Sequence, residues 1–193
     1  VLYDPWKNRL FRLAAEPEGI RLAVRPQELL VVIFNRDEPG LPLFRSGEKA
    51  MRELPLRYRI SLREAGDAGA FRVIRENSAA VNLTVEENLT RFCGEIRYEA
   101  EFDWDGVSAE TLVIPECGDC AELWLNGSYC GAEIGPQCRF EIGGKLKPGR
   151  NTLLIRTADN PAYADRPADG SGVPCGRALP LSKHGFVGNV FIL

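Results

Sequence analysis

Few residues in this sequence could take part in covalent catalysis. His184 is the only histidine among 193 residues, so a Ser-His-Asp triad has one candidate base, and no G-x-S-x-G motif accompanies it. Carboxylates number 27, and general acid–base catalysis would need two of them in different environments. Glu99 and Glu101 share the solvent face of a predicted strand, where neither is less hydrated than the other. The sequence therefore predicts that the chain is not catalytic by itself.

Side chains that could bind a ligand gather in the segment 158–185, which we predict to be a long loop between two strands. Long irregular loops of this kind often carry function, and an aromatic ring beside planar polar groups suits a sugar. A second aromatic candidate lies in a predicted hairpin. The candidate substrate-binding residues are Asn160, Tyr163, Asp165, Arg166, Trp124 and His184. The alternative is that the loop connects or docks a neighbouring domain.

Six cysteines raise the question of a metal site. Cys117 and Cys120 form a CxxC pair, and Cys130 and Cys138 follow closely. Cys130 and Cys138 are spaced too widely for a zinc knuckle. A redox CxxC motif requires a helix after it, and no helix is predicted after Cys120. We therefore expect scattered, reduced cysteines and no metal or other cofactor, with zinc as the alternative.

The charge and hydropathy of the chain argue against several classes of partner. Lys and Arg number 24 against 27 Asp and Glu, so the net charge of −3 leaves no basic surplus for nucleic acid. No apolar run approaches the roughly 18 residues of a membrane-spanning helix, and no membrane partner is expected. Residues 1–9 do not show the basic start followed by an apolar stretch that is typical of a secretion signal. We therefore expect a cytoplasmic location.

The elements that must position the candidate residues are short β-strands. Residues 92–102 alternate apolar and charged side chains, the period-two pattern of a strand with one buried face. Residues 121–131 contain Asn126-Gly127, which suits the positive-φ positions of a type I′ turn and predicts a hairpin. Further strands are predicted at 56–62, 71–74, 111–114, 140–142, 151–157 and 186–193. This spacing predicts an all-β sandwich or jelly roll with little helix, in which Trp6 and Trp104 pack.

The first third of the chain has a different pattern. Short apolar runs at 10–13, 20–24 and 29–34 predict a three-stranded piece. Residues 35–54 are rich in Pro, Gly and charge without periodicity, which indicates a linker or a domain boundary. We therefore expect residues 1–35 to be strands from the end of a preceding β domain, 36–54 to be a linker and 55–193 to be the main sandwich.

Four motifs in the second half of the chain follow an order seen in a known domain family. They are Phe92-Cys-Gly-Glu-Ile-Arg-Tyr-Glu-Ala-Glu-Phe102, Ala121-Glu-Leu-Trp-Leu-Asn-Gly127, Leu146-Lys-Pro-Gly-Arg-Asn-Thr-Leu-Leu-Ile155 and Gly185-Phe-Val-Gly-Asn-Val-Phe-Ile-Leu193. This order resembles the galactose-binding-like β-sandwich of glycoside hydrolases, both the sugar-binding domain of family 2 and the C-terminal sandwich of family 106 rhamnosidase-like enzymes. Residues 3–9 and 22–34 are similar, more loosely, to the segment before this sandwich in the second group.

The resemblance implies a galactose-binding-like jelly-roll sandwich that forms a non-catalytic, C-terminal module of a bacterial-type glycoside hydrolase. In these families the catalytic residues lie in a barrel domain, which this sequence has no strand–helix alternation to build. The implied partners are carbohydrate and the parent catalytic domain, toward which the loop 158–185 would face. A structural calcium ion held by loop carbonyls is also compatible with the family, and such ligands leave no trace in a sequence. The alternative is a structural or protein-interaction sandwich without affinity for sugar.

Each motif also has a mechanical explanation. Asn126-Gly127 and Gly149 form turns, and the side chain of Asn151 can hydrogen-bond to nearby backbone. Tyr98 belongs to the core because it shares the apolar face of its strand. The motifs therefore identify a fold rather than a binding site.

Overall fold

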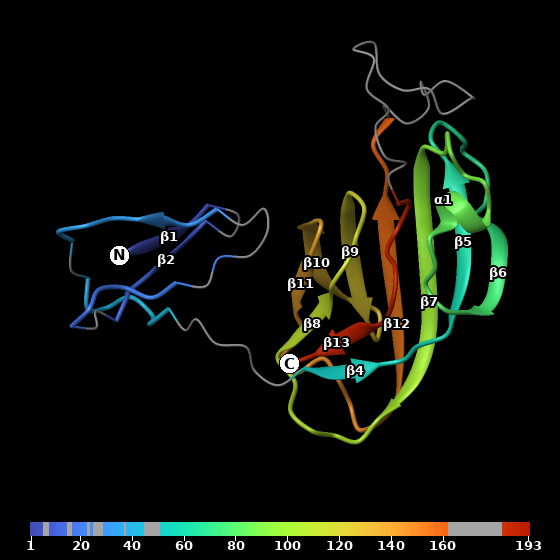
Figure 1. Ribbon diagram of the computed structural model, residues 1–193. Helices are drawn as coiled ribbons and strands as arrows, with labels where there is room; N and C mark the ends of the chain where they lie inside the picture. The colour runs from blue at the N-terminus through green and yellow to red at the C-terminus, as the bar shows by residue number, and fades with distance from the viewer. Residues whose placement is uncertain are drawn as a thin grey trace, which may run out of the picture. The chain divides into compact units, whose positions relative to one another are not determined.

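A computed structural model describes most of the chain and shows two compact units, Val1–Lys49 and Ala50–Leu193 (Figure 1). The described residues are 1–5, 8–14, 17–22, 24, 29–36, 38–44, 51–161 and 183–193.

The unit Val1–Lys49 contains a small antiparallel sheet in the order β2-β1-β3. Its strands are β1 Leu2–Asp4, β2 Arg9–Phe11 and β3 Val31–Val32. The strand predicted at 20–24 is wrong: residues 20–22 lie outside any strand, and Ile20 is 39% exposed, so burial does not favour pairing there. Strand β1 was not predicted from the sequence, because three residues are too few to display a period of two.

The unit Ala50–Leu193 is a sandwich of two antiparallel sheets (Figure 1). The larger sheet has six strands in the order β10-β9-β12-β7-β5-β6. They are β5 Tyr58–Glu64, β6 Arg72–Ser78, β7 Gly94–Trp104, β9 Cys120–Leu125, β10 Ser128–Ile134 and β12 Gly149–Ala158. The long strands β7 and β12 pair over ten residue positions and form the middle of this sheet.

The smaller sheet has four strands in the order β11-β8-β13-β4. They are β4 Arg52–Leu54, β8 Thr111–Ile114, β11 Cys138–Glu141 and β13 Val190–Ile192. Strand β4 corrects the sequence analysis, which placed its residues in a stretch without pattern. Its partner is β13, near the other end of the chain, so no local pattern could show the pairing. The one helix among the described residues is α1 Leu83–Glu86.

Residues from both sheets form one hydrophobic core. On β7, Ile96, Tyr98 and Ala100 are buried while the alternate residues face outward, which confirms the alternation predicted for 92–102. The Tyr98 ring packs on Phe186 with centroids 4.4 Å apart. Gly185 has a φ of +73°, and a Cβ there would lie 1.9 Å from the Tyr98 hydroxyl oxygen, so only glycine fits. The predicted all-β sandwich is confirmed.

The motif asparagines hold turns together. Asn126 (φ 51°) and Gly127 (φ 76°) join β9 to β10, as predicted for a type I′ turn. The buried Asn151 side chain donates to the carbonyl oxygens of Lys147 and Gly149 at 2.8 and 2.7 Å. The Asn126 amide in turn donates to Asn151 Oδ1 at 2.8 Å. The side-chain amides of Asn126 and Asn151 use their hydrogen bonds within the fold and are not available to a ligand.

Candidate ligand-binding face

The outer face of the six-stranded sheet, on the side away from the core, brings aromatic and charged side chains together. Strand register arranges them, because directly opposed residues on paired strands project from the same face. The first row runs from Tyr129 through Trp124 and Leu154 to Glu99 on β7. The second row consists of Glu122, Arg156 and Arg97. The apolar part of the first row therefore lies directly beside a charged row.

The apolar part of the first row contains an aromatic pair that is open to solvent. The ring centroids of Trp124 and Tyr129 are 5.1 Å apart, and the ring planes are tilted by 49°. Tyr129 is 50% exposed and Trp124 is half-buried. The Arg156 guanidinium carbon lies 5.3 Å from the centroid of the Trp124 ring, within the range of a cation–π contact. The two rings thus form an apolar surface, fixed by their mutual contact, beside charged groups.

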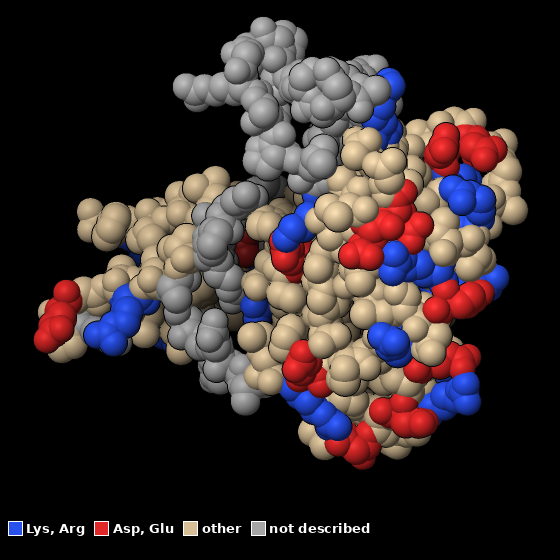
Figure 2. Space-filling model, turned by 45° about the vertical axis from the view of Figure 1, so that its right-hand side comes forward, with Lys and Arg blue, Asp and Glu red and all other residues tan. Residues whose placement is uncertain are grey.

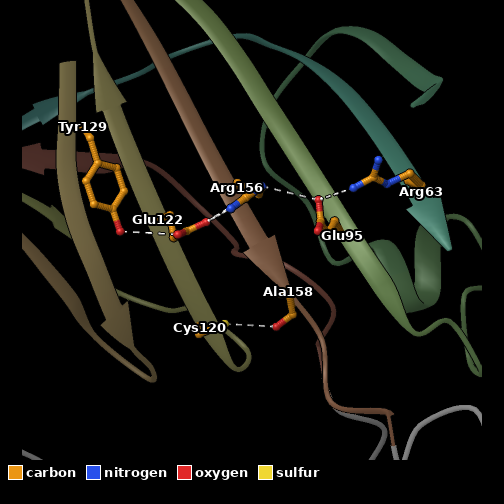
Figure 3. Close-up of polar contacts among 7 residues, drawn as sticks. All are labelled: Arg63, Glu95, Cys120, Glu122, Tyr129, Arg156 and Ala158. Atoms are coloured by element: carbon orange, nitrogen blue, oxygen red, sulfur yellow. Dashed lines mark hydrogen bonds and ion pairs between the residues drawn. The ribbon is translucent and has the colours of Figure 1, made fainter. Parts of the chain in front are cut away.

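A ladder of polar contacts runs from β10 through β9, β12 and β7 to β5 on this face (Figure 3). Tyr129 Oη donates to Glu122 Oε1 at 3.3 Å, and Arg156 Nε donates to Glu122 Oε2 at 2.7 Å. Arg156 Nη1 lies 3.7 Å from Glu95 Oε2, to which Arg63 Nη2 also donates at 3.1 Å. The four charged side chains are 28% to 32% exposed. The ladder therefore fixes planar polar groups at the surface.

The hydroxyl of Tyr129 keeps its proton in this environment. Partial loss of solvent and the nearby Glu122 carboxylate raise the pKa of Tyr129 above its ordinary value of 10.0, with Arg156 opposing the shift. The protonated hydroxyl can donate to Glu122. This contact orients the ring beside Trp124.

Arg97 differs from the other arginines of the face. Its guanidinium carbon lies 3.6 Å from the centroid of the Phe71 ring, and its Nε is buried without a hydrogen-bond partner. It faces Arg156 directly across the β7–β12 pairing. In the part of the chain that the structure describes, no carboxylate forms an ion pair with Arg97.

The residues predicted from sequence to bind a ligand lie in separate places. Trp124 lies on the outer face. His184 is fully buried in the core, which corrects its assignment to a surface site, so Trp124 and His184 do not share one. Asn160 is exposed, and its backbone N–H donates to Asp119 Oδ2 at 3.0 Å. The residues outside the described part of the chain are Tyr163, Asp165 and Arg166.

His184 belongs to a buried pair with Asp159. Its Nδ1 lies 3.2 Å from Asp159 Oδ2, and the two side chains are 0% and 1% exposed. Its backbone N–H donates to Thr84 Oγ1 at 3.0 Å, and its ring meets that of Phe92 edge-on at 5.6 Å. Burial raises the pKa of Asp159, and the contact with His184 opposes that shift. The pair ties the end of β12 to the segment that leads into β13.

Sequence reasoning missed most of the outer face. The missed residues are Tyr129, Glu122, Arg156, Glu95, Arg63, Arg97 and Phe71. Alternation within 92–102 does place Arg97 on a solvent face. Which residues flank it depends on pairings with β5 and β12, and one sequence does not reveal that register.

The cysteines do not form a metal centre among the described residues. The five described cysteines are free, and Cys175 lies outside the described part of the chain. No group of three or more His, Cys, Asp or Glu in the described segments could hold a metal ion. Cys117 and Cys138 are buried, and their contact together with burial raises the pKa of the Cys117 thiol, which stays protonated. A calcium ion held by loop carbonyls stays a prediction.

Acidic and basic side chains are interspersed on the face of the larger unit that Figure 2 shows. Within the described ranges, no helix combines the length and apolar character needed to cross a membrane. The cytoplasmic location expected from the sequence stays a prediction.

The chain is similar to parts of larger solved proteins. A rhamnosidase from Novosphingobium sp. PP1Y matches with a TM-score of 0.57 and 19% identity over 86% of this chain and 17% of that chain. A GH2 β-galacturonidase from Eisenbergiella tayi, solved with glycerol and with galacturonate, matches with TM-scores of 0.50 and 0.51 and 15% identity over 74% of this chain and 24% of that chain. No protein-family model and no curated protein matches the sequence. The chain is therefore similar in fold to parts of these glycoside hydrolases and spans less than a third of their length.

Proposed function

We propose that the chain is a non-catalytic, galactose-binding-like module of a glycoside hydrolase and that it contacts carbohydrate through the outer face of its six-stranded sheet. Trp124 and Tyr129 provide the apolar contact for one face of a sugar ring. Glu122 and Arg156 accept from and donate to the sugar hydroxyls. The catalytic domain of the parent enzyme is the module's neighbour in the longer protein.

One observation carries the proposal: a solvent-open aromatic pair lies directly beside planar hydrogen-bonding groups. A sugar ring has an apolar face and a rim of hydroxyls, and it needs both kinds of contact at once. The centroids of Trp124 and Tyr129 are 5.1 Å apart, and both rings adjoin the Glu122–Arg156 pair. Because the rings and charged groups of this face are only partly buried, we expect weak binding.

Glu95 and Glu122, the two carboxylates of the ladder, are not suited to cleave a glycosidic bond. A catalytic acid needs an apolar pocket that keeps it protonated while its partner stays charged. Glu95 and Glu122 are 31% and 28% exposed, and each contacts an arginine. The two carboxylates therefore have similar environments, which supports a non-catalytic role for this face.

A docking or structural module without affinity for sugar is the second candidate. The ladder favours it in one respect, because Tyr129, Glu122 and Arg156 already satisfy one another within the chain. A ligand would have to compete with these internal contacts. The two candidates predict opposite results for sugar binding by the isolated chain.

The test is saturation-transfer NMR on the full chain with rhamnose, galactose, glucose, mannose and galacturonate, each at millimolar concentration. We expect transfer to at least one sugar, and its loss in Trp124→Ala. The control variant is Phe34→Ala, which removes an aromatic side chain that is 74% exposed outside the sandwich. Transfer that survives in Trp124→Ala, or no transfer to any sugar, would contradict the proposal and favour docking.

A further inference from the structure

Arg97 has no carboxylate partner among the described residues of the outer face. The arginines next to it are Arg63 and Arg156, and the nearby carboxylates are Glu95, Glu99 and Glu122. Glu95 and Glu122 already contact Arg63 or Arg156, and the exposed Glu99, two residues along β7, forms no ion pair with Arg97. Among the described residues, Arg97 is left with a ring contact and no ion pair. The outer N–H groups of its guanidinium are therefore not used by a carboxylate of the described chain.

The surroundings of Arg97 make its unpaired guanidinium costly. Its guanidinium lies against Phe71 at 3.6 Å, with Nε buried and unpartnered. Arg156 lies directly opposite on β12, and like charges at opposed positions destabilise a sheet. Stacking on a ring holds the guanidinium plane, and its outer N–H groups can then donate in parallel to both oxygens of a carboxylate. A bound carboxylate would satisfy these donors.

Arg97 is also correctly spaced from the aromatic pair to serve the same ligand. Register places it two strands and two residues away from Trp124 on the same face. Strand spacing and rise convert this offset to about 12 Å. One sugar ring does not cover that span, whereas two linked rings do.

We propose that Arg97 binds the carboxylate of an acidic sugar, so that the ligand of this face is an oligosaccharide with a uronic acid one ring away from the sugar on Trp124. The inference rests on the proposed function and specifies its ligand. Arg97 provides charge selectivity, and the aromatic pair provides the contact common to all sugars.

The experiment compares digalacturonate with its fully methyl-esterified form by isothermal titration against the full chain. Esterification removes the charge and leaves the rings and linkage unchanged. We expect the acid to bind roughly tenfold more tightly than the ester, as one charge-assisted hydrogen-bonding contact would give. Arg97→Gln should abolish this difference while the affinity for the ester is retained. The matched control is Arg150→Gln, which removes a 72% exposed arginine near the other end of the same sheet and should change nothing.

The possible outcomes separate the inference from the proposed function. Equal binding of acid and ester by the wild-type chain overturns the role of Arg97 and leaves sugar binding intact. A preference for the acid that persists in Arg97→Gln also overturns it. Binding of neither compound overturns the inference about the acidic sugar, and the panel of five sugars then decides by itself whether the proposed function also fails. The wild-type comparison needs no variant, so a variant that fails to fold does not obscure the answer.

Discussion

Two polar side-chain pairs of the Ala50–Leu193 unit lie in opposite environments. Asp159 and His184 are 0% to 1% exposed, whereas Glu122 and Arg156 are 28% to 32% exposed. A buried polar group that loses its partner lowers the free energy of unfolding strongly. At the surface, water replaces much of the lost contact. The contact between Asp159 and His184 therefore serves to stabilise the fold. The surface pair can exchange partners, which a ligand-binding face requires.

Removing one member of the buried pair should have the largest effect on stability. His184→Ala leaves Asp159 buried without its partner and opens space beside Phe92. We expect the free energy of unfolding to fall by about 3–5 kcal/mol, from the cavity together with the buried polar group left without a partner. Urea denaturation followed by tryptophan fluorescence measures it. A loss below about 1 kcal/mol would show that the pair behaves like a surface contact.

The buried pair should also make stability depend on pH. Burial raises the pKa of Asp159 above its ordinary value of 3.8, with Asp119 adding to the shift and His184 opposing it. The folded state therefore favours the protonated carboxyl. Protonation of Asp159 therefore contributes to the stability of the folded state. This contribution is fully present below the pKa that Asp159 has in the unfolded chain, and it is lost as the pH rises through the higher pKa that Asp159 has in the folded chain.

The matched variant for this dependence is Asp159→Asn, which cannot ionise. From about pH 4 to pH 7, we expect the wild-type chain to lose stability relative to the variant. Urea denaturation of both proteins at each pH gives the difference. If the variant instead becomes less stable than the wild-type chain as the pH rises, His184 holds Asp159 as a carboxylate and the two residues form an ion pair.

The surface pair should show the smallest effect on stability and a clear effect on binding. Glu122→Gln weakens the contact with Arg156 but keeps the shape of the side chain. We expect a change in unfolding free energy within about 1 kcal/mol. Sugar binding should weaken, because the amide accepts hydrogen bonds less strongly than the carboxylate. Unchanged binding in a stable variant would remove Glu122 from the ligand-binding face.

Local sequence patterns predict the features that depend on neighbouring residues. Alternation in 92–102 predicts β7, and Asn126-Gly127 predicts the turn between β9 and β10. Both follow from backbone geometry within a few residues. The same reasoning places Trp124 opposite the buried Leu123 and Leu125, and therefore on the outer face.

Long-range pairings determine what the sequence does not reveal. Phe71 and Arg97 come together only because β5, β6 and β7 are adjacent in the sheet. His184 looks like a polar loop residue, and its burial depends on Asp159 at the end of β12. Register and burial are set by the whole sandwich, so one chain without relatives cannot supply them.

The most direct test of the binding face is heteronuclear NMR of the full chain titrated with the sugar that binds best. The account predicts that the Trp124 indole N–H and the amides of Tyr129 and Arg156 shift together, while the amides of Asn160 and Lys183 stay in place. Shifts confined to Asn160 and Lys183, with Trp124 unchanged, would contradict it and assign sugar binding to the loop 158–185.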